Sequence, residues 1–304
     1  MNPAPILMNV AMEPRSKADQ VRVMAALREL KAADGSFEVR TDEESGQIVI
    51  GGASEDQLAG KVEVLQRDYG LDLNTGRPQV AYLETISQRA EVDFVLKQLD
   101  GRRAFARVKL AVVPRDRGEG NVFVPGVESQ VLPETYRIAI GRGSDLVLRS
   151  GILAGFPVAD VAIRLLDWAH HDLDSSEAAF EEATRIAVRE GLQKGVSLLL
   201  EPIMTLEVRV PSDIVETVLA DLRKRRVVAP SRDIEGSVVI VGATAPLATL
   251  FGYTNSLRAM SGGRGTYSTR FSHYEAVPSF TDDGPYPAAM ALRMPAVLAL
   301  GDSA

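Results

Sequence analysis

Residues 1–80 alternate between two kinds of hydrophobic spacing, the two-residue period of strands and the three-to-four-residue period of helices. Helices are expected to begin after Ser16 and Ser54, because a serine side chain can accept hydrogen bonds from the first free N–H groups of a helix. The resulting order β-α-β-β-α-β predicts a ferredoxin-like domain. Its strands are expected at Ile6–Met12, Phe37–Arg40, Gln47–Ile50 and Leu71–Leu73, with a hairpin turn at Asp42–Gly46.

Residues 203–277 repeat this order of patterns. One helix is expected to begin at Pro211-Ser212, and a second to run from about Pro246 to Leu257. A second ferredoxin-like domain is therefore predicted. Its strands are expected at Thr205–Val210, Val227–Val228, Ser237–Val241 and Thr266–His273.

The segment between them, residues 81–202, has a mixed pattern. A helix is expected to begin at Pro133, although Gly141 and Gly143 each weaken it by about 1 kcal/mol relative to alanine. A second helix, ending near Leu192, is opened by the capping pattern Asp174–Glu177. Strands are expected at Glu91–Leu99, Phe105–Val113 and Val158–Leu166.

The predicted fold class is α+β, with ferredoxin-like domains at residues 1–80 and 203–277 flanking a mixed α/β domain at residues 81–202. The remaining tail, residues 278–304, is rich in proline and turn-forming residues. We expect it either to be disordered or to form a short helix near Ala288–Leu292.

Composition excludes several classes of protein. The 304 residues include no cysteine, which rules out a disulfide scaffold, a cysteine-ligated zinc site and thiol catalysis. No apolar run approaches the ~18 residues that a membrane span needs, and the N-terminus lacks the basic and apolar regions of a signal peptide. The formal net charge of −7 argues against nucleic acid as a partner, unless basic residues gather locally.

Basic residues do gather at two places. The first is a predicted hairpin tip that also carries an aromatic side chain, and such a tip suits RNA through phosphate contact and base stacking. The alternative is a solvated charged loop. The second, Arg223–Arg226, ends a predicted helix, where RNA contact competes with a favourable interaction with the helix dipole. The residues proposed for RNA contact are Arg102, Arg103, Phe105 and Arg107 in the tip, Arg225 and Arg226 in the helix, and Arg264 in a later glycine-rich stretch.

Glycine-rich stretches do not match nucleotide-binding motifs. Gly262–Gly265 lacks the G-x-x-x-x-G-K-[ST] pattern and precedes a strand rather than a helix, so a tight turn exposing Arg264 is the favoured interpretation. Gly141–Gly143 likewise fails the dinucleotide fingerprint. Neither paired carboxylates nor a Ser/His/Asp arrangement stands out, so no catalytic residue is proposed.

The histidine pair His170-His171 lies in an acidic stretch with Asp172 and Asp174. A metal site is disfavoured, because adjacent side chains of an extended segment point apart and no cysteine or nearby third histidine supports them. The two remaining hypotheses are an exposed polar loop before a capped helix, and a loop in which His170, His171 and Asp172 contact RNA.

Many of these residues resemble the bacterial elongation factor G family of translational GTPases, in the family's order and over roughly residues 4–277. The stretches resembling its third domain are Glu13-Pro14, Lys17–Asp19 and Thr41–Gln47. Those resembling its fourth domain are Gln79–Thr85, Ser150–Pro157, His171–Glu177 and Leu200–Met204. Those resembling its fifth domain are Phe251–Tyr253, Gly263–Tyr267 and His273–Glu275.

The resemblance implies domains three to five, without the second domain or the GTPase domain that holds GTP and Mg²⁺ in the family. No cofactor is therefore expected in this chain. In the family, domain four has a ribosomal-protein-like α/β fold, enters the decoding region of the small ribosomal subunit and helps to move the tRNA–mRNA complex. Domain five contacts large-subunit ribosomal RNA and the stalk base, and domain three links both to the GTPase domain. A cytoplasmic protein without a membrane partner is implied.

Matched by position, the family's tip histidine falls on His171 and its neighbouring tip loop on Asp100–Ala106. The family's loop is glycine-rich, whereas this chain has Asp100, Arg103 and Ala106 at three of the glycine positions. Because residues other than glycine avoid positive φ, these changes predict an altered path of the loop.

The third domain departs from the family as well. Ser54–Ala59 replaces a helix start that reads Gly-Glu-Leu-His-Leu-Glu in the family. The corresponding residues Glu55 and Gln57 are expected to face the GTPase domain, so the coupling of GTP hydrolysis to movement is expected to differ.

The leading hypothesis is the ribosome-engaging C-terminal part of an elongation-factor-G-like protein, which promotes translocation when joined to its GTPase domain. The altered tip favours a second hypothesis, a paralogue that serves ribosome recycling or rescue. A stand-alone RNA-binding homologue, an enzyme that binds a nucleotide at its glycine loops and a protein-interaction module are the other hypotheses. Because the chain begins at a domain boundary, a fragment is expected rather than a stand-alone protein.

Overall fold

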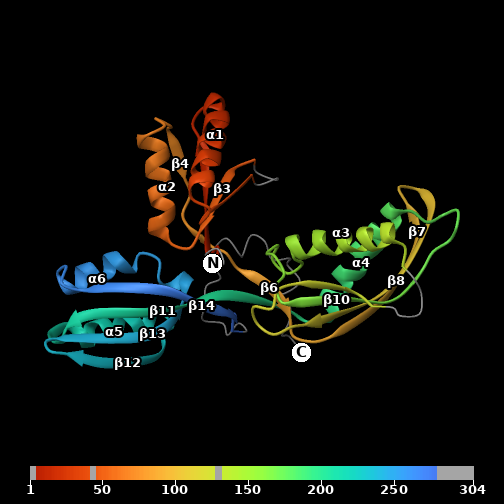
Figure 1. Ribbon diagram of the computed structural model, residues 1–304. Helices are drawn as coiled ribbons and strands as arrows, with labels where there is room; N and C mark the ends of the chain where they lie inside the picture. The colour runs from red at the N-terminus through yellow and green to blue at the C-terminus, as the bar shows by residue number, and fades with distance from the viewer. Residues whose placement is uncertain (1–4, 42–45, 127–131, 279–304) are drawn as a thin grey trace, which may run out of the picture. The chain divides into compact units, whose positions relative to one another are not determined.

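The computed structural model describes residues 5–41, 46–126 and 132–278. Their contacts divide the chain into two compact units, the described parts of Met1–Ala81 with Pro202–Ser272 and of Tyr82–Glu201 with His273–Ala304. Each unit combines antiparallel strands with helices, which confirms the α+β prediction (Figure 1). The predicted hairpin turn at 42–45 and the predicted tail helix lie outside the described residues. No helix in the described ranges has the length and apolar character to cross a bilayer.

The N-terminal sheet has the strand order β2-β3-β1-β4, with β5 also paired to β1, and its described pairs are antiparallel. Both predicted serine caps are present, because Ser16 accepts a hydrogen bond from the Asp19 N–H and Ser54 accepts one from the Gln57 N–H. The elements are β1 (Met8–Pro14), α1 (Lys17–Ala33), β2 (Glu38–Thr41), β3 (Ile48–Gly52), α2 (Glu55–Arg67), β4 (Leu73–Thr75) and β5 (Gln79–Val80).

The C-terminal sheet has the equivalent strand order β12-β13-β11-β14. Its elements are β11 (Ser197–Pro211), η1 (Ser212–Ile214), α5 (Val215–Lys224), β12 (Val228–Glu235), β13 (Val238–Pro246), η2 (Leu247–Thr249), α6 (Tyr253–Ser261) and β14 (Thr266–Ala276). The continuous helix predicted from Pro246 to Leu257 is wrong. Gly252 takes a left-handed φ of 68°, which separates the short η2 turn from α6.

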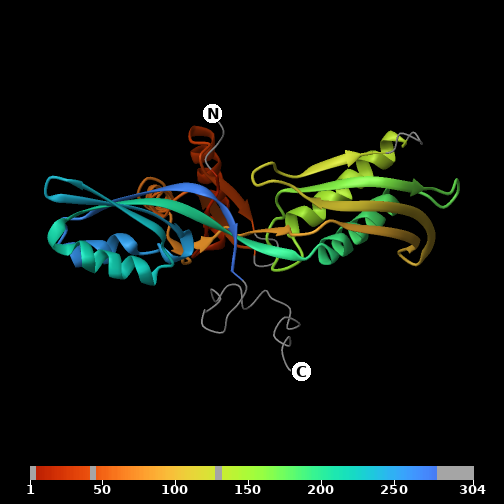
Figure 2. The ribbon, with the colours of Figure 1, turned by 90° about the horizontal axis from the view of Figure 1, so that it is seen from below.

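The second unit contains a four-stranded sheet of order β7-β8-β10-β9, in which only the β9–β10 pair is parallel within the described residues. Figure 2 shows this sheet and its helices from below. The elements are β6 (Leu83–Ile86), β7 (Ala90–Leu99), β8 (Arg102–Pro114), β9 (Val122–Pro125), α3 (Glu134–Ser150), β10 (Val161–Ala169) and α4 (Glu177–Lys194). Strands β6 and β9 were not predicted, and β10 begins three residues later than the strand predicted at Val158–Leu166.

The core of the second unit lies between one face of this sheet and helices α3 and α4. Alternate residues of β8 are fully buried there, which is the two-residue period of a strand with one covered face. The buried residues are Ala106, Val108, Leu110 and Val112. Their neighbours along the strand include Phe105, Arg107 and Lys109, which alternation places on the opposite face.

Candidate nucleic-acid interface

The turn between β7 and β8 is formed by Asp100-Gly101, with Leu99 paired to Arg102. Both turn residues have positive φ, 49° at Asp100 and 76° at Gly101, which is the pattern of a type I′ turn. The predicted loss of positive φ at position 100 is therefore wrong. Aspartate is one of the few residues other than glycine that tolerates this conformation, so the strands remain joined by a two-residue turn.

A second loop, residues 170–176, is fixed against the start of β8 by hydrogen bonds. The Phe105 N–H donates to the Asp174 carbonyl oxygen at 2.8 Å, and the Ser175 hydroxyl donates to the Phe105 carbonyl oxygen at 2.6 Å. The same hydroxyl oxygen accepts a hydrogen bond from the His171 N–H at 2.8 Å. Residues 100–105 and 170–176 thus form one surface, which we call the tip.

His171 lies at the centre of the tip, and its side chain is 55% exposed. Its Nδ1 lies 3.5 Å from the Asp174 carboxylate and accepts a 3.4 Å hydrogen bond from the Leu173 N–H, while its ring centroid lies 6.4 Å from that of Phe105. The imidazole is thus oriented by its own loop and still open to solvent. It borders an open concavity lined by Lys97, Gln98, Arg103, Ala104, Phe105, His171 and Asp174.

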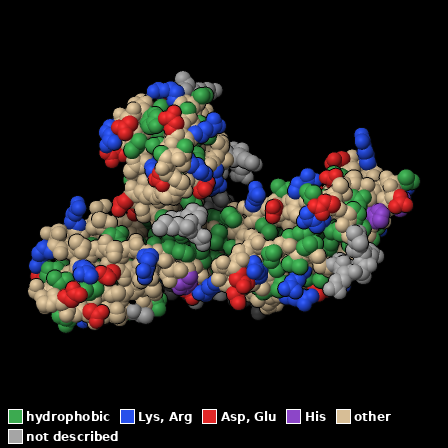
Figure 3. Space-filling view, viewed as in Figure 1, with side chains coloured by type: hydrophobic (Ala, Val, Ile, Leu, Met, Phe, Trp, Pro, Cys, Tyr) green, Lys and Arg blue, Asp and Glu red, His purple; other side chains and the backbone are tan. Residues whose placement is uncertain are grey.

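His170 has different neighbours from His171. Its ring stacks on Trp168, with centroids 5.4 Å apart and planes 25° from parallel, and it lies 6.2 Å from the Tyr136 ring. Its Nε2 lies 3.4 Å from the exposed Asp172 carboxylate. Each predicted histidine is thus supported by an aromatic side chain, and both present polar atoms at the tip. Figure 3 shows hydrophobic, acidic, basic and histidine side chains gathered together at this end of the second unit.

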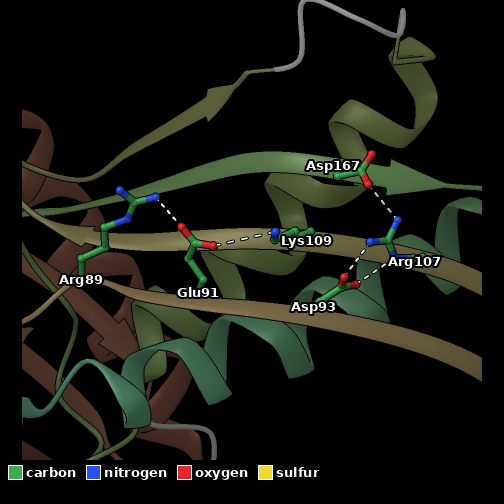
Figure 4. Close-up of polar contacts among 6 residues, drawn as sticks. All are labelled: Arg89, Glu91, Asp93, Arg107, Lys109 and Asp167. Carbon is green, nitrogen blue, oxygen red and sulfur yellow. Dashed lines mark hydrogen bonds and ion pairs between the residues drawn. The ribbon is translucent and has the colours of Figure 1, made fainter.

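The three predicted tip arginines do not have equivalent surroundings. Arg102 and Arg103 are exposed, and their side chains form no ion pair or hydrogen bond within the described residues. Arg107 lies five positions further along β8 than Arg102, between the carboxylates of Asp93 at 2.6 Å and Asp167 at 2.8 Å (Figure 4). Arg107 is therefore already paired with two carboxylates on the outer face of the sheet, and its contact with RNA stays a prediction.

The Arg107 ion pairs also change the acidity of the groups involved. The hydrogen bonds that Arg107 donates to the Asp93 carboxylate, followed by the one to Asp167, raise the pKa of its guanidinium above the usual value. Hydrogen bonding to Arg107 in turn lowers the pKa of Asp93. A neighbouring ion-pair row, Arg89–Glu91–Lys109, lies beside it (Figure 4). This face of the sheet is thus lined with matched charges.

Two of the arginines predicted near α5 and α6 are held by internal contacts. Arg225 pairs with Asp221 at 2.7 Å, donates to the Thr249 carbonyl oxygen at 2.8 Å and lies over the Tyr253 ring. Its side chain is only 18% exposed, so these contacts support the fold, and its contact with RNA stays a prediction. Arg264 pairs with Asp213 at 2.8 Å but remains half exposed. Arg226 is exposed, with a φ of 57°.

The two residues expected to face a GTPase domain are both at the start of α2. The Gln57 side-chain oxygen accepts a hydrogen bond from the Ala53 N–H at 2.8 Å, and its amide donates to the Ser36 hydroxyl at 2.7 Å. Gln57 therefore caps its own helix and ties it to the β2 side of the sheet. Glu55 lies in the first helical turn, where a negative charge complements the helix dipole.

One exposed hydrophobic residue of the tip was not predicted from the sequence. Leu173 is 89% exposed, the highest value among the large hydrophobic side chains that the structure describes as exposed. It lies between Asp172 and Asp174 in the tip loop. An apolar side chain between two acidic ones in a predicted loop was the available signal, since loop positions of this kind are usually polar.

Comparison with known proteins identifies all three parts of the chain. Residues 3–77 match the family model for elongation factor G domain III, residues 78–196 match that for domain IV, and residues 198–283 match that for the elongation factor G C-terminus. An elongation factor G from Rhodopseudomonas palustris (strain BisB18) is 45% identical over 278 residues. The match covers 91% of this chain and 40% of that protein.

A solved structure has a fold similar to that of this chain. A crystal structure of a protein from Thermus thermophilus superposes with a TM-score of 0.69 and 33% sequence identity, covering 96% of this chain and 43% of the other. This chain therefore spans about two fifths of the length of the relatives that it matches. Because three consecutive family models account for nearly all of its length, the chain belongs to the elongation factor G family.

Proposed function

We propose that this chain is the ribosome-engaging part of a translation factor in the cytoplasm, and that its tip enters the decoding region of the small subunit. There it promotes tRNA–mRNA translocation when the chain is joined to a GTPase domain. The observation that carries the proposal is the composition of the tip, where Arg102 and Arg103, which form no ion pair within the described residues, lie near the partly buried ring of Phe105 and the exposed ring of His171. Free cations bind phosphate and rings stack on bases, so this surface suits folded RNA.

The C-terminal sheet supplies a second contact in this proposal. Arg223 and Lys224 end helix α5, are exposed, and form no side-chain ion pair or hydrogen bond within the described residues. With the half-exposed Arg264, they suit the backbone of large-subunit ribosomal RNA near the stalk base. A GTPase domain would dock beside Glu55 on the N-terminal sheet.

Ribosome co-sedimentation tests the tip directly. The double variant Arg102→Ala/Arg103→Ala should bind ribosomes more weakly than the parent, and the dependence of its affinity on salt should be shallower, because two phosphate contacts are lost. The matched control is Arg149→Ala/Arg189→Ala, which removes two exposed cations whose side chains also lack partners within the described residues. Equal losses of affinity in both double variants would contradict a specific role for the tip.

Ribosome recycling is the second candidate function, and the tip again favours it. Directly after a tight Asp100-Gly101 turn, Arg103 stands beside Arg102 at a position where the family's glycine-rich loop has glycine. The two functions can be separated with the chain joined to its GTPase domain. A factor that moves tRNA on intact ribosomes supports translocation, whereas one that splits post-termination ribosomes without moving tRNA supports recycling.

A further inference from the structure

A buried carboxylate lies at the end of the second unit opposite the tip. Glu84 on β6 is only 1% exposed, and its two oxygens accept hydrogen bonds from four backbone N–H groups of the loop that follows α3. The donors are Ile152 at 2.7 Å, Leu153 at 2.9 Å, Ala154 at 2.8 Å and Phe156 at 3.0 Å. We call residues 151–156 with this carboxylate the Glu84 nest, since converging N–H groups form an anion-binding concavity.

The loop leaves room for the Glu84 carboxylate but none for a side chain at position 151. Gly151 has a φ of 61°, and a Cβ there would overlap the Phe156 carbonyl oxygen and lie 2.7 Å from the Glu84 carboxyl carbon. No Lys, Arg or His within the described residues forms an ion pair with Glu84. The four N–H groups thus compensate for a charge that is costly to bury unpaired.

Helix α3 connects the Glu84 nest with the tip. At its C-terminal end, the Gly151 N–H donates to the Val147 carbonyl oxygen, so the nest begins where the helix stops. Near its N-terminal end, Tyr136 stacks on Phe180 at 4.2 Å and lies 6.2–6.3 Å from the rings of His170 and Trp168. The helix spans about 25 Å from its 17 residues, and Figure 1 shows it between β6 and the end of β7.

The two ends of α3 differ in how they are held. Pro133, at the N-terminal end, makes no side-chain capping hydrogen bond, whereas the C-terminal end runs directly into the four hydrogen bonds of Glu84. The four hydrogen bonds hold the C-terminal end beside β6, and Tyr136 packs on Phe180 at the N-terminal end, so the stiff helix transmits a shift at one end to the other.

We propose that Glu84 is a positioning residue for the tip. By fixing the C-terminal end of α3, it sets the place of Tyr136 against Trp168 and His170, and so the orientation of the loop that carries His171. The inference deepens the proposed function and rests on it, since it assigns a remote support to the same RNA-binding surface.

Fluorescence of Trp168 tests this inference without ribosomes, because it is the only tryptophan in the chain. In the full chain, Glu84→Gln and Glu84→Ala should shift Trp168 emission to longer wavelength and increase its quenching by acrylamide. Amide exchange at residues 152–156 should accelerate roughly tenfold or more, since hydrogen bonds to a charged acceptor are lost. In Glu84→Ala, formate should reverse the changes in fluorescence and in amide exchange, because it can occupy the vacated nest. Formate should have no effect on the parent.

A matched control is Glu190→Gln, a surface glutamate of α4 that pairs with Lys194, and it should change neither reading. Unchanged Trp168 emission and quenching together with faster exchange would show that Glu84 is only a local tie, which overturns the proposal. If Glu84→Ala does not fold, the milder Glu84→Gln and Glu84→Asp variants give the same two readings. Failure of ribosome binding would overturn the proposed function and leave these readings untouched.

Discussion

Three arginines at the start of β8 have different surroundings. Arg102 and Arg103 have no side-chain partner in the described part of the chain, whereas Arg107 is held by Asp93 and Asp167 and is 29% exposed. Their close spacing along the chain predicts the same role for all three. To predict that Arg107 differs, one must know which strand lies beside β8. Its partner Asp167 is on β10, 60 residues later in the chain.

At residue scale, replacing His171 by alanine should separate function from stability. The side chain is 55% exposed and packs only against its own loop and Phe105, so the free energy of unfolding should change by no more than about 0.5 kcal/mol. In the full-length factor, translocation should be clearly slower. Urea unfolding and a tRNA-movement assay measure the two effects, and a large loss of stability would show that His171 is a packing residue.

The paired arginine gives a prediction about pH. Arg107→Gln should destabilise the protein more at pH 7 than Arg89→Gln, because Arg107 is less exposed than Arg89 and bonds two carboxylates. Arg107 lowers the pKa of Asp93, so this contribution is present above the unfolded Asp value of about 3.9 and is lost as pH falls through the folded value. The stability gap between parent and Arg107→Gln should therefore narrow below about pH 4.

Urea titrations of both variants and the parent at pH 7 and pH 3 measure these gaps. A gap for Arg107→Gln that stays constant over this range would mean that the ion pair with Asp93 does not contribute to stability.

At the scale of elements, the hydrophobic pattern predicted most helices and strands, and the predicted caps at Ser16 and Ser54 gave the starts of α1 and α2. The features that the hydrophobic pattern did not predict, strand β6 and the break at Gly252, depend on tertiary contacts. Strand β6 is four residues long and is defined by pairing with β11, over a hundred positions later in the chain. Gly252 interrupts an apolar stretch that otherwise has helical spacing, because the chain turns there.

The two glycines of helix α3 also differ in a way that the sequence pattern does not predict. Propensity alone assigns Gly141 and Gly143 the same cost. A Cβ at Gly141 would meet no atom within 4 Å, whereas one at Gly143 would overlap the Glu181 carbonyl oxygen on α4. Gly143 therefore permits the close approach of the two helices, and Gly141 has no such role.

This difference predicts opposite effects for two similar substitutions. Gly141→Ala should stabilise the protein by about 0.5–1 kcal/mol through helix propensity. Gly143→Ala should destabilise it by about 1–3 kcal/mol, because the added methyl group forces α3 and α4 apart. Chemical unfolding of the two single variants tests both signs, and the same sign for both would contradict the packing argument.

For the whole molecule, short motifs spread along the chain were enough to predict the family. The contacts that support the tip could be found only in the structure. The motif around His171 identified the loop, but its contacts with Phe105 and Ser175 depend on how β8 and β10 pair. Likewise, Glu84 lies within a stretch that resembles the family, yet its four backbone donors lie 68 to 72 residues later.

The molecule as a whole should bind no guanine nucleotide by itself. It matches domains III, IV and the C-terminal region of the family and contains no G-x-x-x-x-G-K-[ST] sequence. Isothermal titration of the chain with GTP and Mg²⁺ should give only heats of dilution. Saturable heat would overturn this prediction and revive a nucleotide-binding role for Gly262–Gly265.

The parallel course of α3 and α4 has an electrostatic consequence. Tyr136, near the start of α3, lies beside His170, and α4 begins at the tip after Ser176, so both helices start at the same end of the second unit. Each N-terminus carries roughly half an elementary positive charge from its aligned peptide dipoles. The two fields add to those of Arg102 and Arg103 and offset part of the negative charge of Asp100, Asp172 and Asp174 in the tip, so the helix ends weaken the repulsion that these carboxylates exert on polyanions.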